Sequence, residues 1–121
     1  MKSISDIDDP RLVKALSHPL RVRIMGILEQ RTASPKQLAE ALGVNLENVA
    51  YHVRTLRDFG LIALERRDAV GGAVQHHYRA LARPRVTAEA WRQLPEISQR
   101  AMIGAALEQI GTLVAAAPPP R

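Results

Sequence analysis

Hydrogen-bonding side chains gather on one side of a helix that the sequence predicts at residues 45–58. With successive residues about 100° apart, they fall opposite an apolar sector that must face a core. Asparagine can pair with an adenine edge, arginine with guanine or a phosphate, and the tyrosine and threonine hydroxyls with a base or a phosphate. Such a surface suits the major groove of DNA. The candidate contacts are Asn45, Asn48, Tyr51, His52, Arg54 and Thr55, with Asn45 and His52 at the edges.

A second polar group flanks a predicted β-hairpin. Residues 61–67 and 74–81 have the pattern of strands, and residues 68–73 between them form a glycine-containing turn. Such a hairpin can reach the phosphate backbone or the minor groove beside the helix, although an ordinary solvated hairpin is the alternative. The adjacent His76 and His77 should point to opposite faces, which prevents simple metal chelation. The candidate contacts here are Arg66, Arg67, Gln75, His77 and Arg79.

The distribution of charge agrees with a polyanionic partner. The 121-residue chain has a net charge of +5, and residues 54–85, with seven arginines and three acids, account for +4 of it. The chain has no cysteine, so disulfides, thiolate metal sites and cysteine nucleophiles are excluded. No leader-like or membrane-length apolar segment is evident, and we expect a cytoplasmic protein.

The elements that would position these residues are mostly helices. A first helix is expected from Asp9-Pro10 to about residue 16, and a second at residues 19–30. Ser34 to Gln37 has the form of a capping box that starts a short helix, which Gly43 should end. Two further helices are expected at residues 87–94 and 95–116.

Two short helices joined by a glycine turn and followed by a basic hairpin have the order of a winged helix-turn-helix. Ala39, Gly43 and Val49 supply the small residue, the turn and the apolar lock that such a unit requires. The fold class is therefore mainly α with a small β-hairpin. In the second helix, the predicted core-facing residues are Leu46, Val49, Val53 and Leu56.

The last helix carries a broad apolar stripe, and Gly104 and Gly111 would permit close approach of another helix. A domain of this size has little core left to cover it. Dimerisation together with the first helix is the favoured interpretation, and packing across its own domain is the alternative. A two-fold dimer would place two recognition helices about 34 Å apart, one turn of DNA.

Residues 12–81 resemble the ArsR family of bacterial repressors, most clearly in residues 15–24, 48–56 and 59–62. The resemblance implies a winged-helix dimer, formed by the first and last helices, that binds inverted-repeat operators and releases them when an effector binds. The cysteine motif of the metal-sensing members is absent, and the last helix has no pair of histidines or acids at ligand spacing. We therefore expect no metal and no cofactor.

These patterns divide the chain into a DNA-binding domain at 1–83, a dimerisation segment at 84–117 and a disordered tail at 118–121. The leading hypothesis is a homodimeric repressor. A variant of this hypothesis is a repressor gated by a small apolar effector held between the terminal helices near Trp91 and Met102. The alternative is a winged-helix protein-interaction module that does not bind DNA. No nucleophile-base pair or phosphate loop suggests an enzyme.

Overall fold

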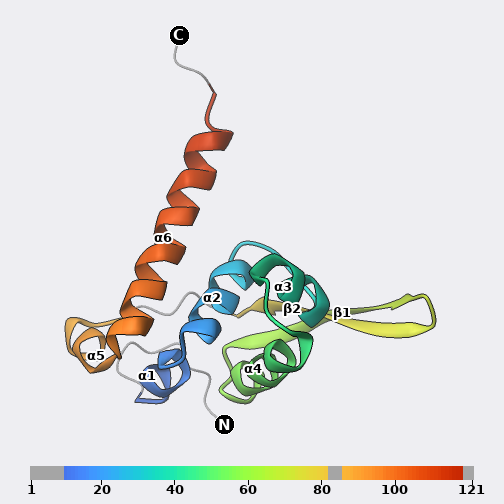
Figure 1. Cartoon of the computed structure of the whole chain (residues 1–121), viewed down its shortest axis with the longest axis horizontal. Coiled ribbons are helices and arrows are strands. Elements are labelled where there is room, and N and C mark those ends of the chain that lie inside the picture. The colour runs from blue at the N-terminus through green and yellow to red at the C-terminus, as the bar shows by residue number, and fades with distance from the viewer. Residues whose placement is uncertain (1–9, 82–85, 119–121) are drawn as a thin grey trace.

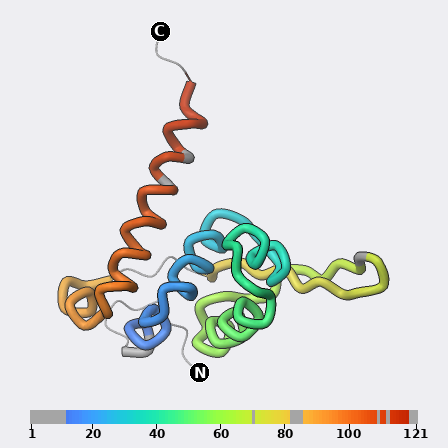
Figure 2. Tube along the Cα trace, viewed as in Figure 1, coloured from blue at the N-terminus to red at the C-terminus, as the bar shows by residue number. Residues whose placement is uncertain are grey.

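The computed structural model describes residues 10–81 and 86–118, which form helices and one two-stranded sheet (Figures 1 and 2). The expected Asp9 cap, the boundary at 83/84 and all of the expected tail except Pro118 lie outside the described residues. The elements are α1 (Pro10–Leu16), α2 (Pro19–Leu28), α3 (Pro35–Leu42), α4 (Leu46–Asp58), β1 (Ile62–Val70), β2 (Ala73–Ala80), α5 (Ala88–Gln93) and α6 (Glu96–Ala116).

Local side-chain hydrogen bonds start α3 and α4, as the sequence predicts. The Ser34 hydroxyl accepts from the Gln37 amide at 3.2 Å, and the Gln37 side chain accepts from the Ser34 amide at 3.0 Å. Gly43 ends α3 with a left-handed φ of 66°, which glycine adopts without the Cβ clash of other residues. Asn45 then caps α4 by accepting from the Asn48 amide at 2.9 Å.

The hairpin is longer than the sequence suggests, because the strands continue to Val70 and resume at Ala73. Only Gly71 and Gly72, both with positive φ, make the turn. The pairing is antiparallel, with an irregularity in register between Leu64 and Arg66. At its base, a β-bridge joins Tyr78 to Ala33, so the hairpin is tied to the segment that precedes α3.

The core lies among α1, α2, α3, α4 and the base of the hairpin, with helices packed on helices and no large aromatic cluster. Its fully buried side chains include Leu12, Ile24, Leu38, Leu56 and Leu61. The low aromatic content of the chain, 3%, is compensated by branched aliphatic residues. This core fixes α3 and α4 relative to the hairpin.

Helix α6 packs against α2 near its start and then projects away from the rest of the molecule (Figure 1). A Cβ built on Gly26 would lie 3.2 Å from the Cβ of Ala105, so glycine permits the close approach of the two helices. Beyond this contact, the large apolar side chains of α6 are exposed. Packing across its own domain therefore covers only the first part of the helix.

Candidate DNA interface

The inner face of α4 differs from the predicted apolar sector at two positions. Val49, Val53 and Leu56 are buried as expected, whereas Leu46 is 49% exposed and His52 is buried. Leu46 is the first residue of the helix and lies beyond the edge of the core. The angular position of a residue gives its direction, but the extent of the neighbouring elements decides whether anything covers it.

The outer face of α4 presents the polar side chains that the sequence predicts there. Tyr51 is 56% exposed at the centre of this face, and Asn48 and Arg54 are exposed beside it. Thr55 is half-buried, and its hydroxyl donates to the Tyr51 carbonyl at 3.0 Å. The Asn45 side-chain oxygen serves the helix cap, so its NH₂ group is the part left for an external acceptor.

His52 does not belong to this exposed face. Its side chain is 7% exposed, and its ring lies 4.2 Å, centroid to centroid, from the ring of His18 before α2. Burial, followed by the neighbouring His18 and Arg21, lowers the pKa of His52 from 6.5 to about 4. His52 is thus a neutral packing residue behind Tyr51, whose ring meets it edge-on at 5.0 Å.

The lowered pKa of His52 predicts a pH-dependent stability. Between pH 6.5 and about 4 the unfolded chain binds a proton here that the folded chain does not, so the free energy of unfolding falls as the pH falls through this window. His52→Phe keeps an aromatic ring but cannot titrate, and should flatten the dependence of the thermal midpoint on pH. His76→Phe, on the exposed face of β2, is the matched control. An unchanged profile for His52→Phe would refute the assignment.

The hairpin presents its arginines to solvent and hides one of the predicted contacts. Arg66, Arg67 and Arg79 are exposed and Gln75 is half-buried, whereas His77 is 4% exposed. His76 is exposed, so the two histidines point to opposite faces as expected. The His77 side chain is therefore part of the base of the hairpin rather than a surface contact.

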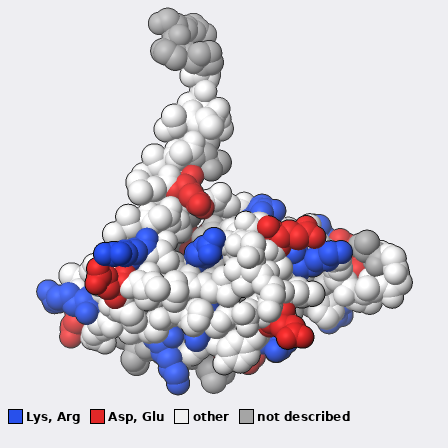
Figure 3. All heavy atoms as spheres, in the orientation of Figure 1, with Lys and Arg blue, Asp and Glu red and all other residues white. Residues whose placement is uncertain are grey.

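The charged side chains of the hairpin are arranged in pairs. Asp68 lies within 3.2 Å of Arg66 and 3.1 Å of His77, and Arg79 lies 3.7 Å from Glu65. Figure 3 shows lysine and arginine distributed over the base of the molecule and the hairpin, with acids among them, while the projecting part of α6 is nearly without charge. On the viewed face, the positive charge forms no continuous patch.

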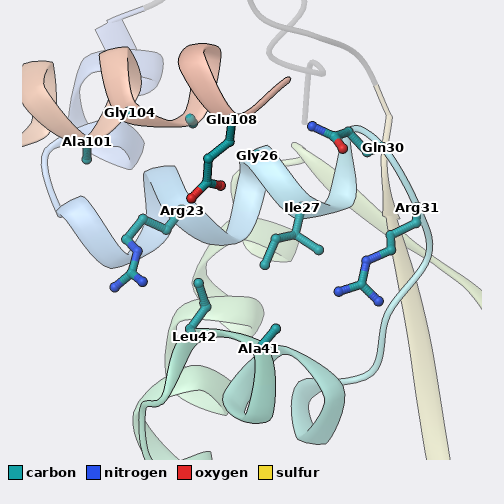
Figure 4. A pocket seen from close by; sticks show the side chains of 11 residues that line it. Arg23, Gly26, Ile27, Gln30, Arg31, Ala41, Leu42, Ala101, Gly104 and Glu108 are labelled. Carbon is teal, nitrogen blue, oxygen red and sulfur yellow. The ribbon is translucent and has the colours of Figure 1, made fainter. Parts of the chain in front are cut away.

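A pocket of about 410 Å³ opens between α2, α3 and α6 (Figure 4). Its walls combine the charged side chains of Arg23, Arg31 and Glu108 with apolar residues that include Leu42 and Ala105. The pocket touches both the first helix of the helix-turn-helix and the projecting helix. A small molecule bound here would contact both.

Trp91 and Met102, around which the sequence suggested an effector site, do not line this pocket. They are half-buried and pack against the core. Among the described residues, no group of three histidines, acids or cysteines could hold a metal ion. Within the same residues, no helix is long and apolar enough to cross a membrane.

Comparison with known proteins finds regulators. Residues 16–65 match a family described as a helix-turn-helix domain. Over 106 residues the chain is 34% identical to the HTH-type transcriptional regulator CmtR of Mycobacterium bovis and of Mycobacterium tuberculosis, covering 84% of this chain and 90% of each relative. A solved structure, a possible transcriptional regulator from Methanosarcina mazei Go1, has a TM-score of 0.47 and 16% identity, covering 86% of this chain and 82% of that chain.

Proposed function

Because this chain belongs to the family of helix-turn-helix transcriptional regulators that includes CmtR, we propose that it is a homodimeric repressor of the ArsR type, not gated by metal, that binds an inverted-repeat operator. The observation that carries this proposal is the outer face of α4. Tyr51, Asn48 and Arg54 are exposed there, on a helix whose opposite face is locked into the core. In this proposal α4 enters the major groove, and the arginines of the hairpin contact the phosphate backbone beside it.

Support for the homodimer comes from α6. After Glu108 the helix has no charged residue, and its large side chains Ile110, Leu113 and Val114, which share one face, are each more than half exposed. An exposed apolar stripe of this kind is stabilised in water when another surface covers it. A second copy of the chain supplies such a surface and gives the two-fold symmetry that an inverted repeat requires.

Independence from metal is supported by the sequence. The chain has no cysteine that could act as a thiolate ligand, and His76 and His77 lie on opposite faces of β2. In the proposed function zinc or arsenite would not release the operator. A cytoplasmic location is part of the same proposal.

The pocket between α2, α3 and α6 is our candidate site for a small-molecule effector. Arg23 and Arg31 at its wall outnumber the single Glu108 carboxylate there, and this excess of positive charge favours an organic anion over the purely apolar ligand suggested by the sequence. Benzoate and octanoate are suitable probes, since each joins a carboxylate to an apolar body. One of them should raise the thermal midpoint of the protein, and Arg31→Ala should remove the shift. No shift with either probe would contradict an anion site.

Binding to the promoter of the protein's own gene tests the main proposal. Fluorescence anisotropy should give an affinity whose logarithm falls linearly with the logarithm of salt concentration, because bound phosphates release counterions. Zinc and arsenite added to the complex should leave the anisotropy unchanged, and release by either would overturn the metal-independent assignment. Absence of binding to this promoter and to genomic fragments would favour the protein-interaction module.

A further inference from the structure

One carboxylate in the hairpin serves two partners from different strands. The Asp68 Oδ2 atom lies 3.2 Å from Nε of Arg66 and 3.1 Å from Nε2 of His77. The strand register explains the meeting, because Arg66 is paired with His77 across the ladder and Asp68 lies two residues further along β1. Residues two apart on a strand, and those directly opposite, share one face of the sheet.

The three side chains are progressively more exposed from His77 through Asp68 to Arg66. The His77 side chain is 5% exposed, that of Asp68 44% and that of Arg66 54%. The buried imidazole is held by packing, and its Nε2 atom contacts the Asp68 carboxylate, an ion pair when His77 is protonated. The same carboxylate accepts a hydrogen bond from Nε of Arg66. Because Asp68 engages Nε, the two terminal nitrogens of Arg66 remain available to another acceptor.

The other arginines of the hairpin have weaker support than Arg66. Arg79 is held more loosely, by an ion pair with Glu65 at 3.7 Å and a bond from a terminal nitrogen to the Ala80 carbonyl at 3.5 Å. In the described part of the chain no side chain pairs with Arg67. An unrestrained arginine loses rotamer entropy when it is ordered on a ligand. Arg66 has already lost part of that freedom in the free protein.

We propose that Asp68 is a positioning residue for DNA binding, which holds Arg66 in the orientation that reaches a phosphate. This inference rests on the proposed function, in which the hairpin contacts the DNA backbone. Asp68 would then strengthen binding even though its own charge is repelled by phosphate.

The sign of the effect separates positioning from simple charge. At about 8 to 10 Å in salt water, one carboxylate changes the affinity for a phosphate by less than about twofold. If only charge mattered, replacing either Asp68 or Glu65 by alanine would slightly tighten binding. If Asp68 positions Arg66, Asp68→Ala weakens binding and Glu65→Ala, the matched control, does not.

A double-mutant cycle tests the inference. Affinity for the promoter fragment is measured by anisotropy for the wild type, Asp68→Ala, Arg66→Ala and the double variant. We expect Asp68→Ala to bind about fivefold more weakly than the wild type. Arg66→Ala should reduce the salt slope by about one contact per protomer. The double variant should bind as weakly as Arg66→Ala alone, with no further loss of affinity. Circular dichroism at the assay temperature verifies that each variant is folded, since Asp68→Ala leaves the His77 Nε2 atom without its partner.

The outcomes distinguish this inference from the function on which it rests. If Asp68→Ala binds as tightly as the wild type or tighter, the inference is overturned. It is also overturned if Asp68→Ala weakens binding by the same factor in the Arg66→Ala variant as in the wild type, because Asp68 then does not act through Arg66. If Arg66→Ala has no effect while Arg54→Ala does, the hairpin contact is refuted but the recognition helix stands. If the wild-type protein does not bind DNA, the proposed function itself fails.

Discussion

Leu107→Glu is expected to convert the protein from a dimer into a monomer and to weaken operator binding by about 100-fold or more. Leu107 lies on α6 and is 62% exposed, so in the isolated chain the substitution costs little. In a dimer the same carboxylate would be buried without a partner in an apolar interface, which is strongly unfavourable. Loss of the second half-site contact removes the gain in affinity that comes from linking two binding modules.

Sedimentation velocity at micromolar concentration measures the first part of this prediction, and anisotropy on the promoter fragment measures the second. Gln93→Glu, which adds the same charge at an exposed polar position of α5, is the control and should remain dimeric. A wild-type mass near one subunit, or a Leu107→Glu variant that stays dimeric and binds normally, would refute the role of α6.

Tyr51→Ala and Arg54→Ala are expected to reduce operator affinity strongly without reducing stability. Both side chains are exposed on the outer face of α4, so their removal creates no cavity. A good arginine contact to a base contributes about 1–3 kcal/mol, and a symmetric dimer loses it at both half-sites, or about 2–6 kcal/mol in all. If Arg54 contacts a phosphate instead, the loss is smaller and the salt slope falls by about one per half-site.

Arg57→Ala is the matched control, because the same residue type lies on the same helix about 120° away from Tyr51 and pairs with Asp58 at 3.4 Å. Its affinity should remain close to that of the wild type. Comparing specific and unrelated DNA separates base contacts from phosphate contacts, since only a base contact lowers the ratio of the two affinities. Normal binding by both Tyr51→Ala and Arg54→Ala would exclude α4 as the recognition helix.

The sequence by itself determined the elements and the order in which they occur. The capping residues Ser34 and Asn45 and the turn residue Gly43 act through groups within three or four positions of themselves. Their effects are local, and periodicity then separates the two faces of α4. The exposed face with Tyr51 and Arg54 was predictable for this reason.

Only the tertiary structure decided which polar residues are buried. His52 and His77 have the residue type of surface contacts, but the packing of His18 over one and the base of the hairpin around the other remove them from the surface. The contacts of Asp68 with His77 and with Arg66 depend on the strand register, which is set by an irregularity in pairing and by a two-glycine turn. A one-residue slip in register would reverse the faces of an entire strand, and such alignment is fixed by contacts between distant parts of the chain rather than by neighbours in sequence.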